Sequence, residues 1–255
     1  MSLADSVSSP GAATSGKKRR APRDVDAPTR SEKAKLTRLA GDLARWWATS
    51  GRDYPWRADE AGTYERIVVE VLLQRTTAAA VSRFYPAFVH RFPGWHELAD
   101  ATPEDLEEFL RPLGLWRRRA ASLLGIARYA AGTGGKFPSN PAEHAGIPAV
   151  GQYVSNAVLM FQHGKAAPLL DVNMARVLER VVRPRRLADI RYDPWLQAAA
   201  KWFVRGPRPS ETNWAVLDFA ALVCKARRPL CQECPVNRYC AFFRRTAEQE
   251  APGKR

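Results

Sequence analysis

Apolar residues recur at helical spacing along most of the chain. From Ser31 onward, Leu36, Leu39 and Leu43 follow one another at intervals of three or four residues, which predicts a helix ended by Gly51. Further helices are predicted at about 64–74, 77–91, 95–99, 103–111, 117–131, 152–161, 174–182, 195–204 and 214–223. Sustained apolar–polar alternation, the mark of a half-buried strand, is absent from the sequence. The pattern therefore predicts an all-α fold.

The N-terminal region has a different composition. Residues 1–30 are rich in Ser, Ala, Gly, Pro and charge, and we interpret them as a disordered basic tail. The run Lys17–Arg20 fits a nuclear address or a DNA-contacting arm, but a solvated tail is the simpler interpretation. The sequence shows no apolar signal segment and no apolar run near the roughly 18 residues of a membrane span. We therefore expect an intracellular protein, cytoplasmic and nucleoid-associated if its source is bacterial.

The net charge points to a polyanionic partner. Lys and Arg outnumber Asp and Glu by 40 to 26, which gives +14 at pH 7. Residues 1–30 contain six basic and three acidic side chains, so most of the excess belongs to the predicted folded part. Nucleic acid fits this balance better than a membrane surface, because no basic amphipathic anchor is evident.

The cysteines form one compact group near the C-terminus. All four have the spacing C-x6-C-x2-C-x5-C, at Cys224, Cys231, Cys234 and Cys240. Four thiolates are the usual ligands of a [4Fe–4S] cluster, which is the interpretation we favour. Zinc is the main alternative, although structural zinc sites usually have two CxxC-like pairs and this loop has one. Two disulfides would suit a small secreted domain better than this chain.

Basic residues lie inside the cysteine loop. Lys225, Arg227 and Arg228 fall between its first two cysteines. They fit either a solvated loop or a clamp on phosphate groups.

One acidic residue interrupts an otherwise apolar helix. Glu70 lies among Ile67, Val68, Val71 and Leu72. A carboxylate in such surroundings is costly unless it is paired or faces a cleft. The sequence leaves two interpretations equally open: an ion pair with a distant Arg, or a carboxyl group that stays protonatable near neutral pH.

A second candidate region spans residues 147–173. Pro148 and Gly151 predict a tight turn before a helix, where free backbone N–H groups can bind a phosphate. This signal alone is weak, because many helix starts look similar. Asp171 follows an apolar run and precedes the next helix, so its simplest role is that of an N-cap.

Together these features resemble the helix–hairpin–helix DNA glycosylases of the endonuclease III superfamily. The resemblance rests on the hairpin Ile147-Pro148-Ala149-Val150-Gly151, on Asp171 about twenty residues further, and on the cysteine loop, and it covers roughly residues 36–243. It implies a two-domain fold with the target base flipped into the cleft between the domains. The implied parts are a basic tail at 1–30, an iron–sulfur cluster domain at 31–61 and 166–243, a six-helix barrel at 62–165 with its hairpin at about 145–160, and a flexible tail at 244–255.

The resemblance also implies catalytic roles. Bifunctional members carry a lysine at the position of Tyr153, so we expect a monofunctional glycosylase without Schiff-base lyase activity. Glu70, Tyr153, Asp171 and Asn173 resemble the mismatch-directed branch of MutY-type and thymine-mismatch enzymes. The implied roles are that Glu70 protonates or hydrogen-bonds the leaving base, that Asp171 stabilises the cationic sugar, and that Tyr153 and Asn173 orient both.

The excised base is less evident. MutY-type enzymes usually have Gln-Gln, a Gly-Leu-Gly-Tyr-Tyr motif and a further C-terminal domain; this chain has Gln74–Thr77 and Gly114–Arg117, and it ends soon after Cys240. Arg75-Thr76-Thr77 and Leu217–Phe219 look more like the thymine-mismatch enzymes. We therefore favour thymine or uracil opposite guanine, with adenine opposite guanine or 8-oxoguanine as the alternative. Gln74 or Arg75 is expected to fill the gap left by the flipped base, and Arg75 to contact the orphan base.

One position departs from the family pattern. Ala149 stands where the family has the first hairpin glycine, which weakens the hairpin contact if that position needs a positive φ. The expected partner is double-stranded DNA containing a mismatch, bound by a monomer without a membrane. A non-catalytic iron–sulfur or zinc DNA-binding module is the rival class.

Overall fold

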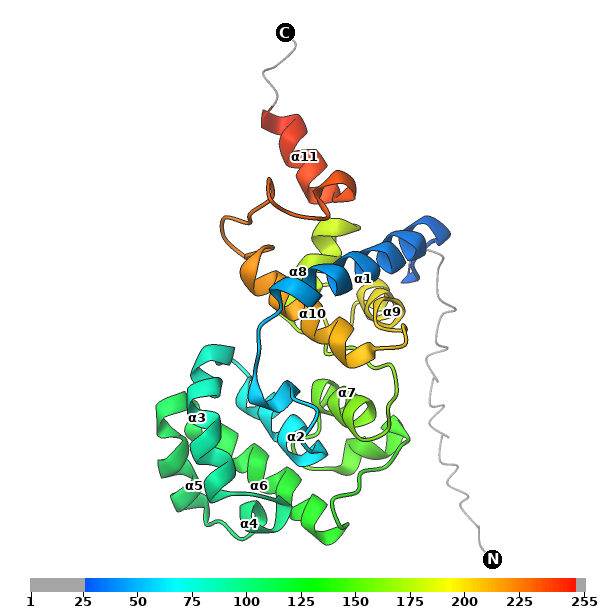
Figure 1. Cartoon of the computed structure of the whole chain (residues 1–255). Helices are drawn as coiled ribbons and strands as arrows, with labels where there is room; N and C mark the ends of the chain where they lie inside the picture. The colour runs from blue at the N-terminus through cyan, green and yellow to red at the C-terminus, as the bar shows by residue number, and fades with distance from the viewer. Residues whose placement is uncertain (1–25, 251–255) are drawn as a thin grey trace, which may run out of the picture.

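The structure is a computed structural model that describes residues 26–250, and this part of the chain is helical without strands (Figure 1). The all-α prediction is therefore confirmed. The α-helices are α1 (Arg30–Ser50), α2 (Thr63–Leu72), α3 (Ala78–Arg91), α4 (Trp95–Ala99), α5 (Pro103–Leu110), α6 (Trp116–Gly132), α7 (Gln152–Phe161), α8 (Val172–Val181), α9 (Pro194–Phe203), α10 (Pro209–Leu222) and α11 (Ala241–Glu250). Short 3-10 helices lie at Pro55–Arg57, Arg111–Leu113, Pro141–Gly146 and Asn237–Tyr239.

The first group of helices contains α2 to α7, and α2 lies at its centre. This helix packs against both α6 and α7, and its residues Ile67 to Leu72 are all buried, Glu70 among them. A helix with apolar residues on every side is stable only inside a protein, which explains its central position. Its core also contains Phe88 and Trp56, the latter from the segment between α1 and α2. The group forms the lower body in Figure 1.

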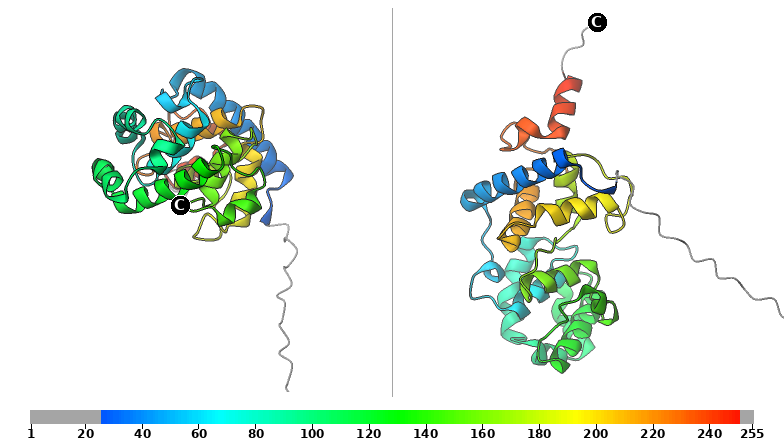
Figure 2. Two further views of the ribbon diagram at one scale, coloured as in Figure 1. Left: turned by 90° about the horizontal axis from the view of Figure 1, so that it is seen from below. Right: turned by 90° about the vertical axis from the view of Figure 1, so that its right-hand side faces the viewer.

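The second group contains α1, α8, α9 and α10, with α11 packed on α8. Both α9 and α10 contact α1 on one side and α8 on the other, and Trp195, Phe203 and Phe219 are fully buried between them. Figure 2 shows this group above the first one, with α11 projecting from the far end. The N-terminal helix thus packs against segments about 160 residues later in the chain.

Two crossings of the chain connect the groups, at residues 51–62 and 162–171. Buried Asn213 holds the second crossing, since its side-chain amide donates to the carbonyl of Ala167 at 3.1 Å and accepts from the amide of Leu169 at 2.6 Å. The predicted domain boundaries near 62 and 166 remain a prediction, although the two apolar cores separate in the same regions.

Two ends of elements differ from the sequence-based expectation. Helix α10 begins at Pro209, whereas the sequence predicted a start at about 214. The prediction missed the first turn because its residues are polar. Pro209 itself occupies a favourable first helical position. The flexible tail expected from residue 244 is instead helical as far as Glu250. Residues 251–255, residues 1–25 and the run Lys17–Arg20 lie outside the described residues. None of the helices that are described is long and apolar enough to cross a membrane.

Candidate active site and iron–sulfur centre

Glu70 and Tyr153 form a buried pair between α2 and α7. The Tyr153 hydroxyl donates a hydrogen bond to Glu70 Oε2 at 2.6 Å, and Glu70 is only 3% exposed. Burial raises the pKa of Glu70 to about 7, although the Tyr153 hydrogen bond and the positive charge of Arg57 act in the opposite direction. A carboxyl group with this pKa holds a proton for a substantial fraction of the time near neutral pH.

Asp171 is the N-cap of α8. Its Oδ1 accepts from the backbone amides of Asn173 at 2.9 Å and Met174 at 2.8 Å, and its Oδ2 accepts from the side-chain amide of Asn173 at 2.5 Å. Burial raises the pKa of Asp171 above its usual value, and these hydrogen bonds limit the rise. The capping role expected from the sequence is therefore present, and it fixes the carboxylate in one orientation.

These groups line one large cavity where the two groups of helices meet. Glu70 comes from α2, Tyr153 from α7, and Asp171 and Asn173 from the start of α8. Gln74 and Arg75 line the same cavity, as do Arg52, Arg57, Leu115, Arg118, Val172 and Arg191. Tertiary folding thus brings together all four expected catalytic residues and both expected gap-filling residues.

Arg57, the cation whose charge lowers the pKa of Glu70, is paired with a different carboxylate. Arg57 forms an ion pair with the fully buried carboxylate of Asp218 at 2.8 Å, and Arg52 pairs with the same carboxylate at 2.7 Å. Trp47 Nε1 also donates to it at 3.0 Å. Burial alone would raise the pKa of Asp218, but the two guanidinium groups outweigh it and hold that pKa below its usual value. Asp218 thereby links the segment before α2 to α10, and Glu70 is left with a hydroxyl partner.

The predicted hairpin lies at the N-terminus of α7. Ala149 has φ +63°, so the position does adopt the left-handed conformation that costs alanine more than glycine. Pro148, Ala149 and Gly151 are all exposed, and Gly151 is the N-cap residue without a side chain to cap the helix. A Cβ atom on Gly125 of α6 would come within 2.9 Å of Pro148 Cβ, so Gly125 lets the hairpin pack against α6.

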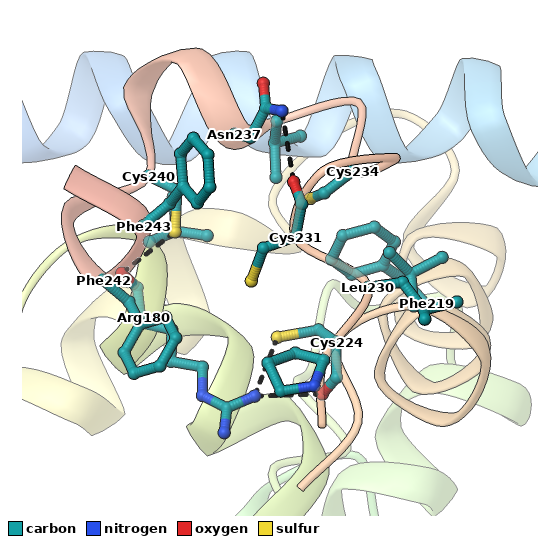
Figure 3. A pocket seen from close by; sticks show the side chains of 14 residues that line it. Arg180, Phe219, Cys224, Leu230, Cys231, Cys234, Asn237, Cys240, Phe242 and Phe243 are labelled. Carbon is teal, nitrogen blue, oxygen red and sulfur yellow. Dashed lines mark hydrogen bonds between the residues drawn. The ribbon is translucent and has the colours of Figure 1, made fainter. Parts of the chain in front are cut away.

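The four cysteines line a second cavity (Figure 3). The sulfur atoms of Cys224, Cys231 and Cys240 turn toward a common space in Figure 3, with Phe242 and Phe243 at its edge. Burial raises the pKa of Cys231 and Cys240, and that of Cys234 to about 11. Burial therefore disfavours the thiolate form of these three cysteines, and a cationic metal centre would stabilise it.

The surroundings of the sulfurs fit such a centre. Arg180 Nη1 lies 3.5 Å from Cys224 Sγ, and the carbonyl oxygen of Arg180 lies 3.3 Å from Cys240 Sγ. Hydrogen bonds of this kind are typical of iron–sulfur sites. Across residues 26–250, no group of three or more His, Cys, Asp or Glu side chains is arranged to hold a single metal ion.

A chain of hydrogen bonds connects the two cavities. Asn173, which contacts Asp171, accepts from Arg176 Nη1 at 3.1 Å, and Arg176 Nε donates to the carbonyl of Cys224 at 2.9 Å. One turn later, Arg180 donates to the carbonyls of Lys225 at 2.7 Å and Ala226 at 3.0 Å. Helix α8 therefore has the Asp171 carboxylate at its start and supports the cysteine loop along its length.

The basic residues of the cysteine loop lie elsewhere. Lys225, Arg227 and Arg228 are exposed, and none of them lines the cavity that contains Glu70 and Asp171. Their expected contact with phosphate groups remains a prediction.

Sequence reasoning missed several residues of the site. Arg119 is buried and donates to the carbonyl of Gln74 at 2.8 Å and to the hydroxyl of Thr76 at 2.7 Å, so it shapes the loop that carries Arg75. Leu115 is 46% exposed at φ +52° on the opposite rim of the cavity. The run of three arginines at 117–119 was the available signal, since a helix that buries one of them, here the last, must give it acceptors.

Comparison with known proteins identifies the class. Residues 68–191 match the HhH-GPD superfamily of base excision DNA repair proteins, and residues 224–240 match the iron–sulfur binding domain of endonuclease III. The chain belongs to the HhH-GPD superfamily: it is a base excision repair DNA glycosylase whose substrate is DNA, and it carries an iron–sulfur binding domain.

Individual relatives show which DNA glycosylases the chain is similar to. A thymine-DNA glycosylase of Aeropyrum pernix is 36% identical over 83% of this chain and 97% of its own. A thymine/uracil-DNA glycosylase of Methanothermobacter thermautotrophicus is 29% identical over 79% and 91%. The human adenine DNA glycosylase is 32% identical over 85% of this chain, which spans only 41% of that relative.

Solved structures agree with this assignment. A thermostable thymine-DNA glycosylase superposes with a TM-score of 0.75 at 27% identity, covering 84% of this chain and 99% of that one. An endonuclease III trapped as a covalent DNA intermediate has a TM-score of 0.70 at 20% identity, covering 84% and 98%, and shows that the fold is shared.

Proposed function

We propose that this DNA glycosylase is monofunctional and removes thymine or uracil opposite guanine from mismatched duplex DNA. The observation that carries the proposal is the convergence of Glu70, Tyr153 and Asp171 on one cavity between the two groups of helices. The thymine- and uracil-specific names of relatives that match nearly their full length support the choice of base.

Glu70 acts on the leaving base in this proposal. Its raised pKa provides a proton or a hydrogen bond for a base whose bond to the sugar is breaking. Because the Tyr153 hydroxyl occupies Oε2, the second carboxyl oxygen is the one available to the base. The base leaves its stack to reach this position, as in other enzymes that flip nucleotides.

Asp171 acts on the sugar. As the glycosidic bond breaks, positive charge develops on the deoxyribose, and a fixed carboxylate stabilises it. The hydrogen bonds from Asn173 and Met174 keep this carboxylate oriented and oppose the rise of its pKa, which favours its ionised form. Two carboxyl groups in different surroundings thus serve the two halves of the reaction.

Strand cleavage through a Schiff base requires a reactive amine near the sugar. Tyr153 stands at the position of the family lysine, and no lysine is found among the described residues that line the cavity. This supports a reaction that ends at an abasic site. Borohydride reduction during turnover is the test: we expect no covalent protein–DNA adduct, and a trapped adduct would refute the monofunctional assignment.

DNA contacts are proposed at three places. The exposed hairpin at Pro148, Ala149 and Gly151 would hold a phosphate with the backbone amides of α7. Gln74 or Arg75 would fill the gap left by the flipped base, with Arg75 contacting the orphan guanine. The cysteine loop, with Lys225, Arg227 and Arg228, would bind further along the backbone.

The remaining proposals concern assembly and cofactor. We propose a [4Fe–4S] cluster on Cys224, Cys231, Cys234 and Cys240, because four cysteines are its usual ligands. Iron and sulfide analysis of anaerobically purified protein is the direct check, with four of each per chain expected. We propose that the enzyme acts inside the cell as a monomer, which light scattering of the free protein tests.

The base preference is tested by base release under single-turnover conditions. Duplexes carrying G·T, G·U, A·G and A·8-oxoguanine are compared, with Asp171→Asn as the inactive control. We expect release of thymine and uracil and a loss of at least about 100-fold for Asp171→Asn. Release of adenine instead would assign the enzyme to the adenine-specific relatives, and full activity of Asp171→Asn would refute the mechanism.

A further inference from the structure

A cationic groove lies between α1 and the C-terminal end of α9. Basic side chains line it along its length, namely Arg30, Lys33, Arg38, Arg45 and Arg205, and the acidic residue in its lining is Asp42. We call this feature the α1 groove. It shares no lining residue with the catalytic cavity.

Aromatic rings hold several of these cations in place. The ring of Trp202 lies under Lys33 Nζ at 4.7 Å and under the guanidinium carbon of Arg205 at 3.1 Å. Trp202 itself is fixed, because its Nε1 donates to the carbonyl of Lys33 at 3.1 Å. The Arg38 guanidinium lies 4.4 Å from the ring centre of Tyr239. Cations held over aromatic rings lose little conformational freedom when they bind an anion.

The acid in the groove neutralises only part of this charge. Asp42 pairs with Arg45 and lies 3.7 Å from Arg38, and it also accepts from the Tyr239 hydroxyl at 2.6 Å. Five cations against one carboxylate leave a clear positive excess. A partner that covers the groove must therefore be strongly anionic.

The spacing along α1 suits a phosphate backbone. Arg30, Lys33, Arg38 and Arg45 follow one face of the helix, and the fifteen helical steps from the first to the last span about 22 Å. This is the length of roughly six nucleotides of one strand at about 3.4 Å each. In the sequence, the basic run Lys17–Arg20 precedes this helix by ten residues.

The groove and the catalytic cavity belong to different sides of the molecule. Helix α8, which carries Asp171, contacts α9 and α10, and α1 contacts the same two helices from the other side. Figure 1 shows α1 crossing in front of α10 with α8 behind it. A duplex bound at the catalytic cavity therefore leaves the α1 groove accessible.

We propose that the α1 groove binds the backbone of a second DNA segment while the first occupies the active site. The enzyme then bridges two segments, and it can pass between them without returning to free solution. DNA is preferred over an acidic protein because DNA is already the substrate, and because a row of cations along one helix suits a continuous phosphate backbone.

The test is a bridging assay with full-length protein. A biotinylated duplex is immobilised, and capture of a fluorescent second duplex is measured as a function of protein and salt concentration. The groove variant is Lys33→Gln/Arg38→Gln/Arg45→Gln. Its control is Arg83→Gln/Arg128→Gln/Lys136→Gln, which removes the same charge from exposed residues outside both the groove and the catalytic cavity.

We expect wild type and the control to capture the second duplex, and the groove variant to capture at least about tenfold less. The affinity of the groove variant for the second duplex should also depend less steeply on salt concentration, by the equivalent of about two to three phosphate contacts. Base release from a short saturated duplex should be equal in all three proteins, and light scattering should show one protein per two duplexes. The proposal fails if wild type does not bridge, or if the groove variant bridges normally. It also fails if an acidic peptide, but no second duplex, competes for the groove.

Discussion

At Glu70 the chain places a carboxyl group inside an apolar helix, and its sequence context leaves two roles open. The structure favours the protonatable carboxyl group, because the nearby cation, Arg57, is paired with Asp218 and not with Glu70. Arg57 is close enough to influence the pKa of Glu70, but its hydrogen bonds go to Asp218. Glu70 therefore keeps a hydroxyl partner, Tyr153, and a raised pKa. An ion pair would have lowered that pKa and removed the proton that the proposed reaction needs.

The pH dependence of base release should follow this pair. Activity requires protonated Glu70 and ionised Asp171, so we expect it to fall above pH 7 and again toward acid, where Asp171 becomes protonated. Glu70→Gln should reduce the rate about 100-fold and abolish the decline above pH 7. Tyr153→Phe should move that decline to higher pH, because it removes a hydrogen bond that favours ionised Glu70. Single-turnover rates across the pH range measure both, and an unchanged alkaline decline in Glu70→Gln would contradict the assignment.

Ala149 provides a second residue-scale prediction. At φ +63° alanine is strained by about 1 kcal/mol relative to glycine, so Ala149→Gly should raise the free energy of unfolding by up to that amount and tighten DNA binding. Gly151→Ala is the matched comparison, because Gly151 has φ −77° and no atom near its missing Cβ. We expect it to leave stability unchanged and to weaken DNA binding. Urea unfolding and fluorescence anisotropy distinguish the two, and a destabilised Ala149→Gly would show that the strain is absent.

At the scale of elements, periodicity was a good guide wherever a helix has one buried face. Helices α3, α6 and α7 begin and end within two residues of their predicted limits. The start of α10 was missed because its first turn is polar and because its buried Asn213 serves the connection between the two groups of helices. Such a role depends on what lies across the interface, which local spacing does not reveal.

Helix α11 covers the cluster cavity, and its loss should expose the cluster. Phe242 and Phe243 line that cavity, and the Phe242 ring lies 4.8 Å from the guanidinium carbon of Arg180. Phe242→Ala/Phe243→Ala should lose iron to a chelator several times faster than wild type, because water and chelator reach the sulfurs more easily. Arg245→Ala on the same helix is the control, since Arg245 is exposed and does not line the cavity. Decay of the visible absorbance measures the rate, and equal rates would mean that α11 gives no protection.

For the whole molecule, Asp218 is the main polar connection between the two groups of helices. It is fully buried and binds Trp47, Arg52 and Arg57, from the end of α1 and the segment that leads to α2. The contact orders the wall of the catalytic cavity to which Arg52 and Arg57 contribute. The Arg57–Asp218 ion pair also keeps Arg57 from pairing with Glu70, so Asp218 influences the pKa of Glu70.

Asp218→Asn should therefore have two effects. It leaves two partly buried guanidinium groups without a counter-charge, and the free energy of unfolding should fall by about 3 to 5 kcal/mol. Freed Arg57 should also lower the pKa of Glu70 and move the alkaline decline of activity to lower pH. Asp189→Asn breaks an exposed pair with Arg191 and should leave stability nearly unchanged. Denaturant unfolding tests the first effect; if both variants behave alike, Asp218 is not the connection described.

The sequence by itself determined the helical class, most helix limits and the four cysteine positions, because these depend on spacing within a few dozen residues. A family resemblance also predicted roles for Glu70, Tyr153 and Asp171, which the structure brings to one cavity. Only the tertiary structure decided that Tyr153, 83 residues from Glu70, is its partner, and that Arg57 is committed to Asp218, 161 residues away. The pKa of a buried carboxyl group depends on which charges and hydroxyls are near it in space, and that proximity is set by packing between distant segments.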